Sequence, residues 1–209
     1  MLQSEALSKV RNMLNEASAG FYSDNNLYSF MDSAMNISIE IIIAKLEQMK
    51  KENIYAGSLV LTPLDTLDSN HTLTNGTSEY SLPANFLYTD YCDFYGVPAD
   101  YIEFKEGNID QQNTYTAWTL DNPAYYIRGT KLGFFPTPPS TSVTGYNHYY
   151  YKIPTAISSG TASSEIPLKS ESHEAIVRIT YGLALIKDNK PNEAQQAIES
   201  GKLSLMNLY

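Results

Sequence analysis

Helical periodicity at both ends of the chain encloses a long middle region of short β-prone runs, and this order restricts the fold more than any other feature. In the first fifty residues, and again from Glu171 onward, apolar side chains recur every three or four positions. In between, runs rich in Tyr, Phe, Val and Ile are separated by Gly, Pro, Asn and Asp. We therefore expect an α+β fold, with a pair of helices on each side of a region of strands.

Four amphipathic helices are predicted. Their ranges are Ser4–Ala19, a second helix that begins at Ser23 or Asp24 and reaches Lys51, a third over Glu171–Lys187, and a fourth that starts at Pro191. None of these helices can bury its apolar face alone, so the N-terminal and C-terminal pairs are expected to pack together as one bundle.

The middle region is predicted to be an inserted antiparallel β domain. The predicted strands are Ser58–Leu61, Glu79–Leu82, Phe86–Tyr95, Tyr101–Phe104, Ala124–Gly129, Lys131–Phe135 and Tyr146–Ile153. Glycines between the runs can close hairpins, so consecutive strands are expected to be antiparallel. Two segments rich in Thr, Ser and Asn, Thr62–Thr74 and Ser140–Gly145, are predicted loops. The expected domains are a helical bundle of residues 1–55 and 168–209 and a β-rich insertion of residues 56–167.

Acidic residues are concentrated in the insertion. The chain has a formal net charge of −9, and between Glu52 and Ile127 eleven acids face one base, Lys105, which leaves +1 for the remainder. Such a region repels phosphate at short range, so tight nucleic-acid binding through it is disfavoured. Passage of DNA along it without adhesion is not disfavoured.

Catalytic and metal-binding signatures are not found in the sequence. Glycine-rich phosphate loops, the Gly-x-Ser-x-Gly pattern and the calcium-loop pattern are missing, and His173-Glu174 lacks a second His four positions on. The acid pairs Asp90 with Asp93 and Glu103 with Glu106 are too common a pattern to indicate acid/base catalysis. The single cysteine, Cys92, lies in an aromatic run and is expected to be a buried, unreactive thiol. We expect no enzyme activity, cofactor, metal or membrane span, and we expect synthesis in a cytoplasm.

Tyrosine is the compositional excess, with 17 residues in 209. Two clusters in predicted strands, Tyr125-Tyr126 and Tyr149-Tyr150-Tyr151, place rings on both strand faces because neighbouring side chains alternate. One face can be core. The other is open to three interpretations: a second core layer, a platform for stacking sugars, or a contact between subunits, and these five tyrosines are candidates for the last.

Four segments resemble adaptor, or head-to-tail connector, proteins of tailed phages, particularly short-tailed and crAss-like phages. They follow one another in the family's order: an aromatic start to the second helix, a strand ending in Leu-Pro, paired strands with prolines, and the approach to the third helix. The segments are Phe21–Leu27, Tyr80–Phe86, Leu132–Pro138 with the strand Tyr149–Pro154, and Glu165–Leu168 with His173–Val177.

The resemblance implies a structural virion protein at the neck. It would assemble in the host cytoplasm as a homo-oligomeric ring, expected to be dodecameric, with the portal and with tail or nozzle proteins as partners and with genomic DNA passing through unbound. A separate hypothesis assigns portal docking to the apolar end of the chain: Leu203, Leu205, Met206, Leu208 and Tyr209. The alternative is that these residues only close the helical bundle. The alternative function is a carbohydrate-binding or receptor-binding module of the tail, suggested by the tyrosine-rich strands and by Trp118.

Overall fold

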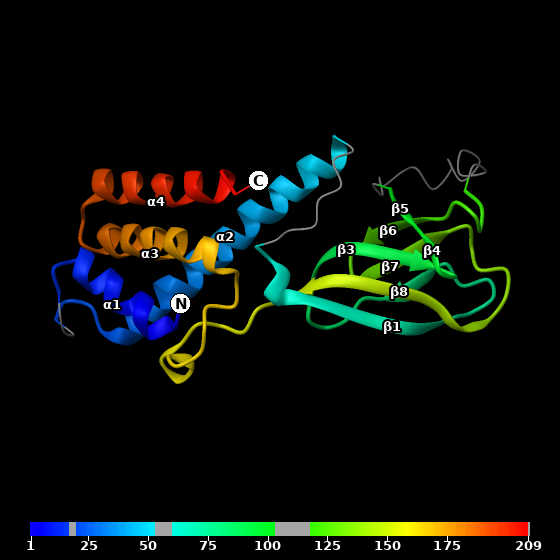
Figure 1. Cartoon of the computed structure of the whole chain (residues 1–209), viewed down its shortest axis with the longest axis horizontal. Coiled ribbons are helices and arrows are strands. Elements are labelled where there is room, and N and C mark those ends of the chain that lie inside the picture. Colours follow the sequence, from blue (N-terminus) through cyan, green and yellow to red (C-terminus); the bar gives the residue numbers. More distant parts are fainter. Residues whose placement is uncertain (17–19, 53–59, 103–117, 209) are drawn as a thin grey trace. The chain divides into compact units, whose positions relative to one another are not determined.

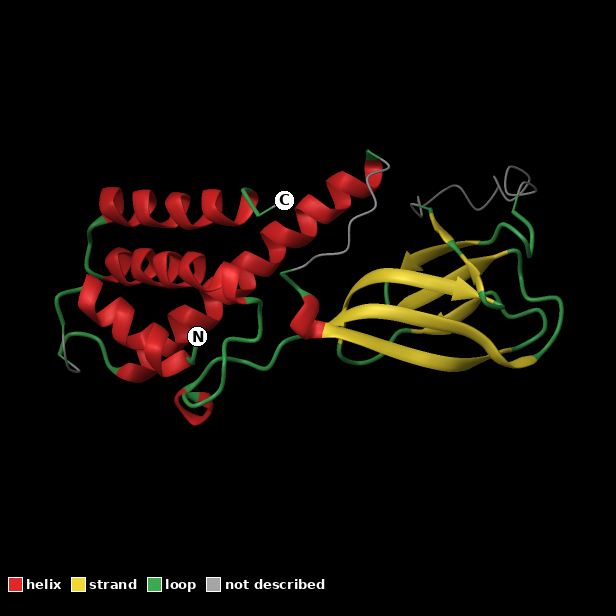
Figure 2. Cartoon of the chain, in the orientation of Figure 1, coloured by secondary structure: helices red, strands yellow, loops and turns green. Residues whose placement is uncertain are grey.

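The computed structural model describes residues 1–16, 20–52, 60–102 and 118–208. The chain divides into two compact units: a helical unit made of Met1–Leu64 with Pro154–Tyr209, and a β unit made of Asp65–Ile153 (Figure 1). Helices come from both ends of the sequence and strands from its middle, which confirms the predicted α+β class (Figure 2).

The helical unit is one bundle, as predicted. Its described α-helices are α1 (Gln3–Met13), α2 (Asp24–Lys51), α3 (His173–Lys187) and α4 (Pro191–Met206), with short 3₁₀ helices at Thr62–Leu64, Ser159–Thr161 and Ser170–Ser172. α3 contacts the other three helices, and α2 also contacts α4, so the two terminal pairs bury their apolar faces together. α1 is shorter than predicted because Asn15 adopts a positive φ of 56°, while the predicted end at Ala19 lies outside the described residues.

α3 and α4 approach each other closely at two glycines. A Cβ atom on Gly182 would lie 2.9 Å from the carbonyl oxygen of Ala194, and one on Gly201 would lie 2.9 Å from that of Ala175. Each helix therefore presents a notch to the backbone of the other. A side chain at either position would force the hairpin apart.

The segment that returns from the β unit binds the helices through its backbone. The amides of Gln3 and Ser4 donate to the carbonyls of Ser164 and Ala162, both at 3.0 Å, which satisfies two of the free backbone donors at the start of α1. The amide of Ile157 donates to Oδ1 of Asp32 in α2 at 2.8 Å. Residues 154–168 thus pack with the helical unit.

The β unit contains two sheets among its described residues, ordered β1-β8-β3-β4 and β2-β7-β6-β5. The strands are β1 (Asp65–Leu73), β2 (Glu79–Ser81), β3 (Phe86–Phe94), β4 (Val97–Pro98), β5 (Asp100–Tyr101), β6 (Ala124–Arg128), β7 (Lys131–Phe135) and β8 (Ser142–Lys152). All described pairs are antiparallel except β5 with β6, which is parallel. The expected pairing of consecutive strands holds for β3–β4 and β6–β7, whereas β1, β2 and β3 pair with strands far along the chain.

The two sheets pack face to face around an aromatic core. Cys92, Phe94 and Tyr146 from the first sheet meet Tyr125 and Phe134 from the second. The rings of Phe94 and Phe134 stack with centroids 4.8 Å apart. Cys92 is fully buried, as predicted, and burial raises the pKa of its thiol, so the thiolate form is suppressed.

Three local predictions were wrong. Thr62–Thr74 was expected to be a loop but contains β1, and the predicted loop Ser140–Gly145 contains the start of β8. β1 is an edge strand with mostly exposed or half-buried side chains, so it needs few apolar residues and shows no apolar alternation. Val60 and Leu61, predicted to end a strand, form a turn, and Ser58 and Phe104 lie outside the described residues.

Among the described residues, one helix is long and apolar enough to cross a membrane, Asp24–Met49 in α2. This is weak evidence for a span, because a core helix of a soluble protein passes the same test. In this chain Leu27, Met31 and Ile42 are buried within the helical unit.

Candidate partner-binding surfaces

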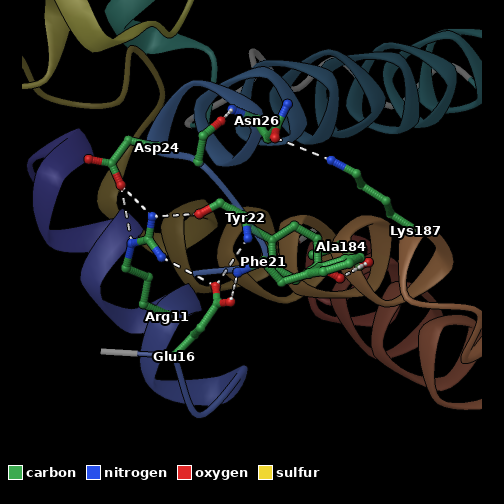
Figure 3. A network of polar contacts seen from close by, with 9 residues as sticks. Arg11, Glu16, Phe21, Tyr22, Asp24, Asn26, Ala184 and Lys187 are labelled. Carbon is green, nitrogen blue, oxygen red and sulfur yellow. Dashed lines mark hydrogen bonds and ion pairs between the residues drawn. The ribbon is translucent and has the colours of Figure 1, made fainter. Parts of the chain in front are cut away.

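The connection between α1 and α2 is organised around the buried guanidinium of Arg11 (Figure 3). Its Nε donates to Oδ1 of Asp24 at 3.2 Å, and its Nη2 donates both to Asp24 and to the carbonyl oxygen of Tyr22 at 3.1 Å. Its Nη1 lies 3.4 Å from Oε2 of Glu16. The Glu16 carboxylate in turn accepts hydrogen bonds from the backbone amides of Phe21 and Tyr22. One arginine therefore fixes the start of α2 against α1.

Tyr22 joins this connection to the end of α3. Its ring is buried, which raises the pKa of its hydroxyl, and the hydroxyl donates to the carbonyl oxygen of Ala184 at 2.6 Å. Phe21 is exposed and meets the Tyr22 ring edge-on. Nζ of Lys187 lies 5.9 Å from the Phe21 ring centroid and donates to Oδ1 of Asn26 at 3.2 Å (Figure 3). The segment that carries the first family resemblance thus has a structural role, with Phe21 left at the surface.

A hollow of about 220 Å³ lies beside Phe21 and Tyr22. Its apolar wall includes Met13 and Leu185. Its polar residues include three carboxylates, Glu16, Asp188 and Glu193, and one lysine, Lys190, whose Nζ is 2.6 Å from Oδ2 of Asp188. This charge balance disfavours an anionic ligand.

The candidate docking residues at the end of the chain do not share one environment. Leu203 and Met206 lie on the outer side of α4 and are 54% and 44% exposed. Leu205 is buried in the bundle and Leu208 is partly buried. Tyr209 lies outside the described residues. Of the four described residues, Leu203 and Met206 are the two with exposed side chains.

Four of the five candidate inter-subunit tyrosines are buried inside the chain. Tyr125 belongs to the core between the sheets, and Tyr126 lies against Gly133 on the opposite strand, where a Cβ would be 2.1 Å from the ring. The hydroxyl of Tyr150 donates to Oδ1 of Asn85 at 2.9 Å, and that of Tyr151 donates to Oδ1 of Asp90 at 3.2 Å. These four rings are therefore packed inside the chain, and Tyr125 belongs to the core between the two sheets.

Tyr149 is the exposed member of the five, and two residues not singled out from the sequence lie beside it. In the register of the first sheet, Leu67 of β1 and Tyr91 of β3 stand directly opposite Tyr149 of β8, one on each side. Tyr91 lay in a predicted strand, and it would have been identified as a neighbour of Tyr149 if the register of the strand pairing had been known. Leu67 lay in a predicted loop, and no local signal marked it.

The three histidines do not gather at one site, although His71 and His148 lie near each other in the first sheet. His71 lies in β1, His148 in β8 and His173 at the start of α3. His71 stacks on Tyr146 with centroids 4.6 Å apart, and Nε2 of His173 lies 2.7 Å from the carbonyl oxygen of Leu168. Across the described ranges, no three His, Cys, Asp or Glu residues are grouped so that they could hold a metal ion.

A family model described as SU10 adaptor protein matches residues 5–206, so the match spans both units and every segment on which the resemblance rests. No curated protein matches the chain.

Proposed function

The chain belongs to the SU10 adaptor protein family, a family of phage head-to-tail adaptors, and from that premise we propose that its copies form a ring between portal and tail. Membership makes the chain a structural component of the virion neck and implies contact with portal and tail proteins. The single observation that carries the proposal is a family match that runs through both the helical bundle and the inserted β unit.

In this proposal the ring is dodecameric, assembles in the host cytoplasm and lines the channel through which the genome leaves. The charge of the chain supports a channel wall to which DNA does not adhere. The sequence of the β unit carries ten acids and four bases, and that of the helical unit thirteen acids and ten bases, so both units are net negative. A negative wall repels the phosphate backbone, so DNA can slide past it. The role requires no catalysis and no cofactor.

We assign the portal contact to the outer side of the end of α4. Leu203 and Met206 are about one helical turn apart, and together they form an apolar surface of which roughly half is exposed. Residues of this kind gain stabilisation when a partner removes them from water, at roughly 25 cal/mol per Å² of apolar area.

The portal assignment is tested by changing Leu203 and Met206 to Ser together. We expect retention on immobilised portal to fall by at least about tenfold, since full burial of an apolar side chain contributes roughly 1.5–3 kcal/mol and about half of each of these two remains to be buried. Thermal unfolding should shift little because both positions are exposed.

Leu205→Ala is the matched control. Leu205 is buried, so this change should lower the unfolding temperature and leave the docking surface in place. Deletion of residues 203–209 would not separate a loss of portal binding from a loss of stability, because it removes Leu205 as well. Unchanged portal binding by the double variant would contradict the assignment.

Imaging of the purified chain by negative-stain electron microscopy, with and without portal rings, tests the proposed function itself. Rings, or added density on one face of the portal, are expected. A monomeric mass together with binding on a glycan array would favour the alternative of a carbohydrate-binding or receptor-binding tail module, for which the exposed pair Tyr91 and Tyr149 is the supporting observation.

A further inference from the structure

Three neighbouring strands of the first sheet place Leu67, Tyr149 and Tyr91 in one row, which we call the tyrosine strip. Leu67 is 51% exposed and each tyrosine is 37% exposed. The two rings lie with centroids 5.3 Å apart and tilted by 53°. Alternate side chains of this sheet form the core with the second sheet, so the strip belongs to the opposite, outer face. Parts of two adjacent aromatic rings and an aliphatic side chain are thus open to a partner.

Rows of polar side chains flank the strip. In one flanking row Asp65 stands opposite Tyr151, whose hydroxyl donates to Oδ1 of Asp90. The pKa of the Asp65 carboxyl is raised, chiefly because the group is partly buried. The negative charge of the nearby Asp90 raises this pKa further. This end of the strip therefore carries two carboxylates that repel each other.

The other flanking row carries a third carboxylate. Nδ2 of Asn147 lies 3.2 Å and 3.0 Å from the two oxygens of Asp93, and Oδ1 of Asn147 accepts the backbone amide of Asn70 at 2.9 Å. These contacts hold the Asp93 carboxylate in place near Tyr91, where it is 8% exposed and acts on the strip mainly through its charge. Because the side chain of Asn147 is neutral, its hydrogen bonds do not cancel the negative charge of Asp93.

The charge of the sheet indicates what kind of partner fits. Its four strands carry four aspartates and one lysine, Lys152, which pairs with Phe86 at the far end of the β3–β8 ladder. A cationic group placed over the rings would be attracted both by their faces and by the flanking carboxylates. A second copy of this chain, with its net charge of −9, is a poor source of that charge.

We infer that the tyrosine strip binds an arginine side chain on an extended, basic segment of a partner protein of the neck or tail. Arginine fits better than lysine because its planar guanidinium can stack on a ring while its edge donates hydrogen bonds to a carboxylate. Leu67 supports the aliphatic part of the same segment. The inference rests on the proposed function, since a connector must bind neighbouring virion proteins, and it replaces the expected contact between copies at Tyr149.

The test is a titration of the purified full-length chain against a fluorescein-labelled peptide of alternating Arg and Gly, followed by fluorescence anisotropy. Peptides with Lys or Glu in place of Arg are titrated in parallel. The variant Tyr91→Ala with Tyr149→Ala removes the rings but leaves every aspartate in place. The variant Tyr101→Ala, which removes an exposed tyrosine of the second sheet, is the matched control.

The inference predicts binding of the Arg peptide that weakens as salt increases, and weaker binding of the Lys peptide. The double variant should bind the Arg peptide about tenfold more weakly, as expected for the loss of two cation–π contacts, and the control should match the unchanged chain. Equal binding by the double variant, equal binding of Arg and Lys peptides, or binding of the Glu peptide would overturn the inference.

Two other outcomes would assign the strip to a different occupant and would also overturn the inference. Loss of self-association in the double variant, without Arg-peptide binding, would make the strip a contact between copies. Glycan binding that the double variant loses would make it a sugar platform. Because the titration uses the chain without portal, its failure leaves ring imaging as an independent test of the adaptor role.

Discussion

His148 is buried in β8 beside two aromatic rings, with its Nε2 2.9 Å from Oγ1 of Thr89. The ring of Phe86 lies 5.7 Å from it and that of Tyr150 5.1 Å, centroid to centroid. Burial lowers the pKa of its imidazole from 6.5 to about 4, against a smaller raising effect of Asp68. The folded chain therefore holds this side chain neutral at physiological pH.

Because the buried imidazole is neutral in the folded chain, we expect the free energy of unfolding to decrease in acid. Between pH 6.5 and about 4 the unfolded chain binds a proton at this imidazole and the folded chain does not, so stability should fall as pH falls through that window. The loss should level off below about pH 4 and should total on the order of 3 kcal/mol. Urea unfolding at a series of pH values in unchanged chain and in His148→Gln measures it. Parallel curves for the two proteins would contradict the prediction.

Exposure at single positions also decides which aromatic residues can bind partners. Tyr149 and Tyr150 are neighbours in the sequence, yet Tyr150 is buried and hydrogen-bonded to Asn85 while Tyr149 faces outward. Strand alternation predicts that their faces differ. It does not predict which face is covered, and the sequence-based list of five tyrosines therefore contained four core residues.

At the scale of elements, the α3–α4 hairpin is held at short range by its two glycines. Helix propensity alone disfavours glycine by about 1 kcal/mol relative to alanine. Gly182 and Gly201 are nevertheless located where a Cβ would meet the backbone of the facing helix. Close packing of the two helices over their length offsets the local cost.

Gly201→Ala should accordingly destabilise the chain by about 1–3 kcal/mol, because the added methyl group would push α4 away from Ala175 and Ile179. In an exposed helix the same Gly→Ala substitution would stabilise the chain, so the expected change in stability has the opposite sign here. Ser204→Ala, at an exposed position of α4, is the control and should change stability by less than about 0.5 kcal/mol. Calorimetric unfolding of both variants measures the difference. A stabilised Gly201→Ala would show that the helices separate at no cost.

At the scale of the whole molecule, negative charge is carried by both units and is denser in the β unit. The purified chain should therefore fail to bind duplex DNA even at about 50 mM salt, where non-specific binding by basic proteins is strong. Fluorescence anisotropy with a labelled duplex measures this, with a basic DNA-binding protein as positive control. Salt-dependent binding by the chain would argue against a channel wall that DNA passes without adhering.

Local periodicity was sufficient to predict the α+β class, the start of α2 at Ser23 or Asp24, the start of α4 at Pro191, and one bundle built from both ends, because a helix's apolar face is encoded within a few consecutive residues. The strand pairings were decided only in the tertiary structure. β1 pairs with β8 across more than seventy residues, and its polar sequence is acceptable because it forms an edge. The tyrosine strip exists only through those long-range pairings, since Leu67, Tyr91 and Tyr149 become neighbours when three distant strands align.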